Sequence, residues 1–231
     1  APHYLNANVC NGLHGRARPV ATGARLANSR LTVIVESGDG CVYGEGGNHF
    51  LAAIRRNINV TLLVHNNQVY GLTKGQASPT SMEGFVTKAK PDGAHSLPFN
   101  PVAVAVAMKA GFVARGFTGQ VESLAGLIQM GIAHPGFALI DILQPCVTFN
   151  KVNTYRWYKE RCQQVPAEHN PADWGAAMKI ADQWDEHIPV GLIYRNERPA
   201  FESHFPACAG GALARGEVKT ASLASILMSY G

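Results

Sequence analysis

Two short polar segments of the chain contain residue types suited to holding a metal ion and a phosphate group. The segment 37–40 (SGDG) directly follows the apolar run 31–36, and the segment 65–67 (HNN) directly follows the apolar run 60–64. A carboxylate and an amide oxygen are good Mg²⁺ ligands, and glycines let phosphate oxygens approach the backbone. We therefore expect Asp39 and Asn67 to bind one Mg²⁺ ion that holds a diphosphate.

The same two segments also have simpler interpretations. The GDG sequence suits a turn from a strand into a helix, and an Asn-Asn pair suits an Asx turn, both for backbone reasons alone. The occurrence of both segments after two successive apolar runs favours a cofactor site. A dinucleotide site is the competing α/β interpretation, but Gly44, Gly46 and Gly47 do not form the GxGxxG pattern.

The elements that would position these residues are those of a parallel sheet. Runs 31–36 and 60–64 are continuously apolar and rich in β-branched residues, as in strands buried on both faces, and 49–57 has helical spacing, so 31–64 is a βαβ unit. We predict further strands at 111–115, 137–143 and 190–194, and helices at 101–110, 121–133 and 173–186. The fold class is α/β, an open, mostly parallel sheet with helices on both faces, which binds ligands at the carboxyl ends of its strands.

Two regions do not fit this alternation. Residues 73–98 are rich in Gly, Pro, Ser and Lys, and a long loop of this kind is usually functional or mobile. Residues 196–231 are irregular apart from a short helix at 220–228. We divide the chain into a cofactor-binding domain, 1–198, and an irregular C-terminal tail, 199–231.

Composition excludes several classes of protein. The 231 residues are 46% hydrophobic and 16% charged, which excludes a disordered chain. The net charge of +4 comes without a run of Lys or Arg, so nucleic acid is not expected as a partner. The longest apolar stretch, 101–108, is far shorter than the roughly 20 residues that span a bilayer. Five dispersed cysteines without a CxxC pair indicate reduced thiols and a cytoplasmic protein.

Longer motifs carry a family resemblance. Segments 12–23 (GLHGRARPVATG), 46–50 (GGNHF), 68–81 (QVYGLTKGQASPTS) and 145–160 (PCVTFNKVNTYRWYKE) resemble the β subunit of 2-oxoacid:ferredoxin oxidoreductases. The spacing from GDG to NN is similar to the fingerprint of thiamine diphosphate enzymes. The likeness extends from the first residues to about Arg198. The chain has no initiator Met, and it resembles a β subunit without its N-terminal segment.

This resemblance implies a thiamine diphosphate-binding fold and a set of roles. Mg²⁺ would be bound by the side chains of Asp39 and Asn67 and by the backbone carbonyl of Val69. The other residues expected along the cofactor are His14, Gly38, Gly40, Cys41, Gly71 and Leu72, four of which (Gly40, Cys41, Gly71 and Leu72) would offer backbone N–H groups to the diphosphate. Arg16 would add positive charge nearby.

Two further residues acquire roles from the resemblance. Lys74, in the GLTKGQ loop, would face the carboxylate of the 2-oxoacid, which favours a 2-oxoglutarate-type or broad-range enzyme. Cys146, in PCVTFN, would be one of four thiolate ligands of a [4Fe–4S] cluster. The other three ligands lie, in the family, N-terminal to the region where this chain begins.

The implied activity is the oxidative, coenzyme A-dependent decarboxylation of a 2-oxoacid, either 2-oxoglutarate or pyruvate, with electrons passing to ferredoxin. The glutamate that activates the cofactor would come from a partner α subunit, so no catalytic residue is assigned to this chain. Two alternatives stay open. One is a cluster-free thiamine diphosphate-dependent decarboxylase or carboligase, and the other is a truncated, non-catalytic scaffold subunit.

Overall fold

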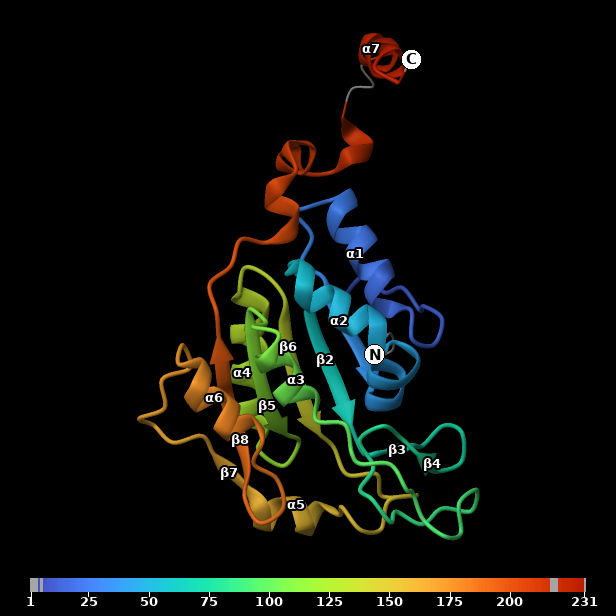
Figure 1. Ribbon diagram of the computed structural model, residues 1–231, viewed down its shortest axis with the longest axis vertical. Coiled ribbons are helices and arrows are strands. Elements are labelled where there is room, and N and C mark those ends of the chain that lie inside the picture. The colour runs from blue at the N-terminus through green and yellow to red at the C-terminus, as the bar shows by residue number, and fades with distance from the viewer. Residues whose placement is uncertain (1–3, 5, 217–219, 231) are drawn as a thin grey trace.

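A six-stranded sheet forms the centre of the protein (Figure 1). The structure is a computed structural model that describes residues 4, 6–216 and 220–230. The strands are β1 (Ile34–Gly38), β2 (Thr61–Asn66), β5 (Phe112–Phe117), β6 (Ala138–Leu143), β7 (Cys162–Gln164) and β8 (Ile188–Arg195). Their spatial order is β1-β2-β6-β5-β8-β7. The first four in this order run parallel, β8 is antiparallel to β5, and β7 is parallel to β8. The expected mostly parallel sheet is confirmed.

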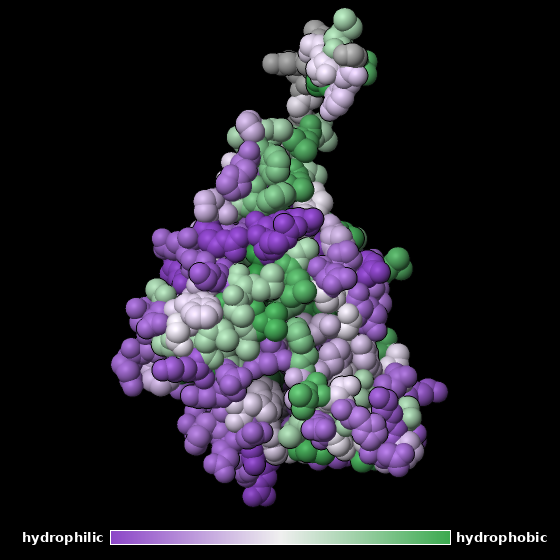
Figure 2. All heavy atoms as spheres, in the orientation of Figure 1, coloured by the Kyte–Doolittle hydropathy of each residue, from purple (hydrophilic) through white to green (hydrophobic). Residues whose placement is uncertain are grey.

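Helices cover both faces of this sheet, as expected (Figure 1). One face packs against α1 (Ala17–Ala27), α2 (Gly47–Arg56), α3 (Pro101–Ala107) and α6 (Trp174–Ala181), and the other against α4 (Val121–Ala133). Helix α5 (Tyr155–Arg161) packs against the carboxyl ends of β5 and β6, and the hairpin β3 (Val69–Tyr70) and β4 (Gln76–Ala77) forms a separate small sheet. Apolar side chains gather around α3 in the middle of the face shown in Figure 2, with hydrophilic side chains around them.

Most predicted elements occur with shifted ends. The βαβ unit is confirmed as β1-α2-β2, with β1 beginning at Ile34, and α4 has the predicted bounds. The helix predicted at 173–186 is too long, because Asp185 has a φ of 75°, a left-handed conformation that a helix interior does not contain. Helix α3 ends at Ala107 for the same reason, since Lys109 has a φ of 54°. Helix α1, helix α5, strand β7 and a π-helix, η1 (Gly40–Glu45), were not predicted.

A polar row crosses one face of the sheet at the carboxyl ends of its strands. Arg115 on β5 pairs in register with Asp141 on β6, and Asp141 pairs with Val64 on β2. Alternate residues of a strand share a face, so Asn66 lies on the face of Val64. Asp39 directly follows β1 in a helical conformation and joins this row through Thr80, whose hydroxyl lies within hydrogen-bond distance of both Asp39 and Asn66. The earlier residues of this face, Val35, Leu62, Val113 and Leu139, are apolar and form the core with the helices. On this face of the sheet, polar side chains therefore take the place of apolar ones only at the carboxyl ends of the strands, which is where ligands of such sheets bind.

The C-terminal segment folds back on α1. It forms three 3₁₀-helices, Phe201–His204, Pro206–Gly210 and Leu213–Arg215, followed by the expected helix α7 (Thr220–Met228). Arg25 of α1 forms an ion pair with Glu202, with Nε and Oε1 2.5 Å apart. Residues 200–216 are therefore more ordered than expected, and the division of the chain at residue 198 stays a prediction. Across the described residues, no helix has both the length and the apolar character that a bilayer requires.

Candidate cofactor site

Asp39 lies at the centre of a buried hydroxyl cluster. Asp39 is the residue that directly follows β1, and it is only 2% exposed. Its Oδ2 accepts hydrogen bonds from Ser78 Oγ at 2.5 Å and from Thr80 Oγ1 at 2.7 Å. Burial raises the pKa of Asp39, and the hydrogen bonds from Ser78 and Thr80 counter part of that rise. In the described part of the chain Asp39 forms no ion pair, so its charge is stabilised by neutral donors alone.

The cluster continues from β1 to β2 and β6 through side chains of the polar row. Thr80 Oγ1 also lies 2.9 Å from Asn66 Oδ1, and Asn66 Nδ2 donates to both carboxylate oxygens of Asp141 at 3.2 Å. Tyr43 of η1 donates its hydroxyl to Asp141 Oδ1 at 2.8 Å. Burial raises the pKa of Asp141 to about 6, although Arg115 and these hydrogen bonds favour its ionised form.

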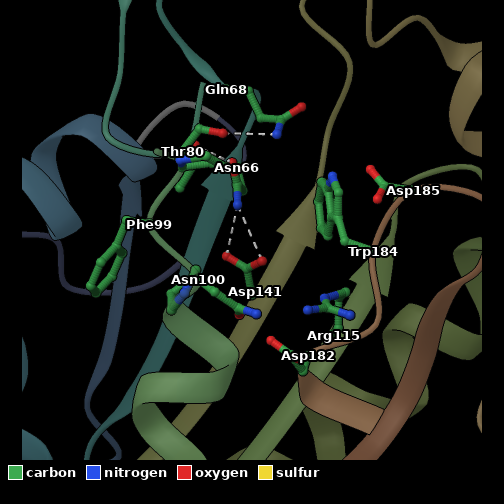
Figure 3. Close-up of a pocket in the computed structure, with 12 residues that line it drawn as sticks. Asn66, Gln68, Thr80, Phe99, Asn100, Arg115, Asp141, Asp182, Trp184 and Asp185 are labelled. Atoms are coloured by element: carbon green, nitrogen blue, oxygen red, sulfur yellow. Dashed lines mark hydrogen bonds between the residues drawn. The ribbon is translucent and has the colours of Figure 1, made fainter. Parts of the chain in front are cut away.

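Asp141 and Arg115 line a cavity of about 290 Å³ beside this cluster (Figure 3). The Arg115 guanidinium donates to the backbone carbonyls of Ala181 and Pro189, and it lies over the Trp184 ring with 5.4 Å between Cζ and the ring centroid. No ion pair shorter than 4.0 Å joins Arg115 to Asp141 among the described residues, and the Asp141 carboxylate is directed at Asn66 (Figure 3). Asp141 therefore contacts Asn66, which in turn lies beside Thr80 and the Asp39 cluster.

Asn67 has a different environment from Asn66. Its Oδ1 accepts the backbone N–H of Val69 at 3.1 Å, which is an Asx turn, and its carbonyl accepts a hydrogen bond from Asn150. Gln68 adopts a left-handed φ of 57° between them. The structure thus brings Asn66 into the Asp39 cluster, while Asn67 and Val69 form the turn beside it. Their role as Mg²⁺ ligands stays a prediction.

A tyrosine ring packs on the glycines of η1. Tyr70 Oη donates to the Gly40 carbonyl at 3.3 Å and lies 3.2 Å from Glu45 Oε1. A Cβ at Gly40 would lie 2.2 Å from Tyr70 Cε1, and one at Gly44 would lie 2.4 Å from Tyr70 Oη. These positions are compatible with the ring only because they lack a side chain. Gly38 is exposed at the end of β1, and Gly40 is buried at the start of η1.

His14 and the loop after β3 surround an open pocket of about 530 Å³. His14 Nε2 lies 2.8 Å from Glu45 Oε2, and Arg16 donates to the Glu45 carbonyl, so both predicted residues reach the end of η1. Leu72 and Lys74 are exposed in the neighbouring loop, and Gly71 is half-buried. Lys74 has a left-handed φ of 73°.

The two cysteines predicted to have roles are both half-buried. Cys41 Sγ accepts the backbone N–H of Gly15 at 3.0 Å, which ties η1 to the segment before α1. Cys146 packs against the small cluster of Val69 and Phe85, and its Sγ lies 3.5 Å from the backbone nitrogen of Phe149. Within the described ranges no group of three or more His, Cys, Asp or Glu side chains could hold a metal. A [4Fe–4S] cluster at Cys146 therefore needs three further thiolates from outside these residues.

The residues present fit a Mg²⁺–diphosphate group. A buried carboxylate without a cationic partner gains most from a divalent cation, and oxygen donors are what Mg²⁺ prefers. Gly38 and Gly40 flank Asp39, and neither adds a side chain of its own beside the backbone that a phosphate would approach. Both features belong to residues that were predicted for this role from the sequence, namely Gly38, Asp39 and Gly40.

Several residues of the site were not predicted. Ser78 and Thr80 lie in a loop without periodicity, and nothing in the sequence connects them to Asp39. Asp141 and Arg115 carried a signal, because a charged residue inside an apolar strand, as in FALIDIL and FVARGF, is costly unless it has a partner. Tyr43 carried none.

Comparisons with known proteins agree with this geometry. Residues 1–142 match the family model "Thiamine pyrophosphate enzyme, C-terminal TPP binding domain", and residues 146–210 match the model for the C-terminal part of the pyruvate ferredoxin oxidoreductase beta subunit. The β subunit of 2-oxoacid:ferredoxin oxidoreductase 1 from Aeropyrum pernix is 44% identical over 206 residues, which cover 84% of this chain and 65% of the relative. The corresponding subunit from a Sulfolobus species is 41% identical over 220 residues, 89% of this chain and 72% of the relative. The chain thus spans about two thirds of these curated relatives.

A solved structure is similar in fold as well as in sequence. It is the 2-oxoglutarate:ferredoxin oxidoreductase from Magnetococcus marinus with 2-oxoglutarate, coenzyme A and succinyl-CoA bound. The TM-score is 0.84 at 36% identity, with 92% of this chain and 73% of that chain covered. The GDG site, the sheet that positions it and these matches together show that the chain belongs to the family of 2-oxoacid:ferredoxin oxidoreductase β subunits.

Proposed function

We propose that this chain is the thiamine diphosphate-binding subunit of an enzyme that oxidatively decarboxylates a 2-oxoacid and transfers the acyl group to coenzyme A. The observation that carries the proposal is the buried carboxylate of Asp39 at the carboxyl end of β1, which is surrounded by hydroxyl groups and forms no ion pair with any described residue. Family membership supplies the class of reaction, and this carboxylate supplies a site for the metal that such a cofactor needs.

The proposed contacts are those that the family resemblance implies. Asp39, the Asn67 side chain and the Val69 carbonyl would hold Mg²⁺, and backbone N–H groups of Gly40, Cys41, Gly71 and Leu72 would bind the diphosphate. His14 and Gly38 would lie beside the cofactor. When bound, thiamine diphosphate supplies the electron sink for the carbon that loses CO₂. This chain's own residues hold and orient it.

Partners complete the proposal. Apolar side chains at Leu13, Leu72, Val147 and Phe149 are exposed on loops near the site, which supports a partner α subunit that covers the cofactor and provides the activating glutamate. Ferredoxin would accept the electrons from a [4Fe–4S] cluster that takes one thiolate from Cys146. All five cysteines are free, which supports a cytoplasmic location.

Measuring thiamine diphosphate and iron on one sample of the purified complex tests the function. Cofactor together with iron at cluster stoichiometry is the expected result. Cofactor without iron would replace the proposal with a cluster-free decarboxylase or carboligase. Absence of both would leave a scaffold subunit as the better description.

We further propose 2-oxoglutarate as the preferred substrate, with Lys74 binding its carboxylate. Lys74→Met should raise the KM for 2-oxoglutarate about 10-fold to 100-fold, the usual value of a hydrogen bond to a charged group, and change kcat less. Steady-state kinetics of the complex measure both constants. Lys179→Met, at an exposed position on α6, is the matched control. An unchanged KM in the Lys74 variant would remove this residue from the substrate site.

A further inference from the structure

Thr80 lies between Asp39 and Asn66, and its hydroxyl hydrogen can be donated to either of them. The Thr80 hydroxyl has one hydrogen, and both Asp39 Oδ2 at 2.7 Å and Asn66 Oδ1 at 2.9 Å can accept it. The Ser78 hydroxyl is a more distant third partner at 3.2 Å, and its own hydrogen is donated to Asp39. A hydrogen bond donated to Asp39 neutralises part of the charge that a metal ion would use. The partner that Thr80 selects therefore affects Asp39 as a ligand.

The orientation of the Asn66 amide depends on Asp141. An ionised carboxylate only accepts hydrogen bonds, so the Asn66 NH₂ group has to face Asp141 and its carbonyl has to face Thr80. Asp141 is 1% exposed and also accepts the Tyr43 hydroxyl, while Arg115 on the neighbouring strand favours its charge. No hydrogen bond joins Asp141 directly to Asp39 among the described residues. Asn66 and Thr80 link the two carboxylates, and the two charges also repel each other directly.

We propose that Asp141 is a positioning residue for the metal ligand Asp39, because it fixes the Asn66 carbonyl toward Thr80 and so draws the Thr80 hydroxyl hydrogen away from Asp39. This inference rests on the proposed function, in which Asp39 binds Mg²⁺. It assigns a role to two side chains, Asp141 and Asn66, that lie outside the predicted ligand set.

The isosteric substitution Asp141→Asn should reverse the orientation of the Asn66 amide and the direction in which Thr80 donates. In Asp141→Asn the new amide can donate to the Asn66 carbonyl, which turns the Asn66 NH₂ group toward Thr80. Thr80 then donates fully to Asp39. We expect the affinity for Mg²⁺, in the presence of thiamine diphosphate, to fall about tenfold.

A double-mutant cycle separates this role from a structural one. Thr80→Val removes the hydroxyl hydrogen that Asp39 and Asn66 share, so this variant should bind Mg²⁺ at least as tightly as the wild type. Adding Asp141→Asn to it should weaken binding clearly less than in the wild-type background, because only the direct effect of the lost Asp141 charge on Asp39 then remains. Asp173→Asn is the matched control, because it makes the same substitution at an exposed residue outside the site, where asparagine can still accept the Ala176 N–H, and its Mg²⁺ affinity should equal that of the wild type.

The measurement is a calorimetric Mg²⁺ titration of each purified complex, stripped of metal and supplied with thiamine diphosphate. A wild type that binds no Mg²⁺ contradicts the proposed function itself. A wild type that binds Mg²⁺ together with an unaffected Asp141→Asn variant, or with an equal loss in the Thr80→Val background, overturns only the positioning role. Should Asp141→Asn fail to assemble, a weakened Thr80→Val variant would still overturn it.

Discussion

Replacing Asp39 with alanine is expected to abolish Mg²⁺-dependent binding of thiamine diphosphate, with a loss of affinity of at least about 100-fold. Asp39 is the charged member of the predicted ligand set, and the remaining members are an amide and a backbone carbonyl. Without the carboxylate, nothing in that set balances the charge of a metal ion that also binds a diphosphate. Titration of the metal-free complex with thiamine diphosphate, at fixed Mg²⁺, measures the effect.

Glu36→Ala provides the control for this experiment. Glu36 is a carboxylate on β1, three residues before Asp39, but it is exposed and hydrogen-bonds His65. Its removal should leave cofactor affinity unchanged. The melting temperature of each metal-free variant distinguishes loss of a ligand from loss of the fold. If a folded Asp39→Ala complex kept wild-type affinity, the site would have to lie elsewhere.

Replacing Asn57 with alanine is expected to lower the free energy of unfolding by about 3–5 kcal/mol. Asn57 is fully buried and ends α2 with a left-handed φ of 57°. Its Nδ2 donates to the carbonyls of Arg198 and Pro199 at 3.1 Å, and its Oδ1 accepts the Phe137 N–H at 3.0 Å. Alanine leaves these three backbone groups without their partner and tolerates the left-handed conformation poorly.

Urea unfolding of the purified protein, followed by circular dichroism, measures this change. Asn57→Gly restores the backbone freedom but not the side-chain hydrogen bonds, so it should lie between alanine and the wild type. Asn48→Ala, at an exposed position near the start of α2, should have no effect beyond about 0.5 kcal/mol. A loss smaller than about 1 kcal/mol in Asn57→Ala would show that the C-terminal segment is held mainly by other contacts, such as Arg25 with Glu202.

Local patterns predicted the elements that carry the site. The apolar, β-branched runs 31–36 and 60–64 both form parallel strands, which continue two residues into the polar segments that follow. The bounds of α4 followed from its apolar spacing alone. The end of α3 did not, because it depends on the left-handed conformation of Lys109, which no periodic pattern encodes. Helix α6 also ends before its predicted bound, at Ala181.

The sequence by itself determined that Asp39 lies at the carboxyl end of a buried parallel strand, because strand periodicity and turn chemistry depend on neighbouring residues. Only the tertiary structure decided what surrounds this carboxylate. Thr80 comes from a loop without a pattern, and Asp141 lies 75 positions after Asn66 in the chain. They meet because sheet order and register bring β1, β2, β6 and β5 together on one face. Pairing between distant strands is set by the packing of the whole core, and no local segment contains that information.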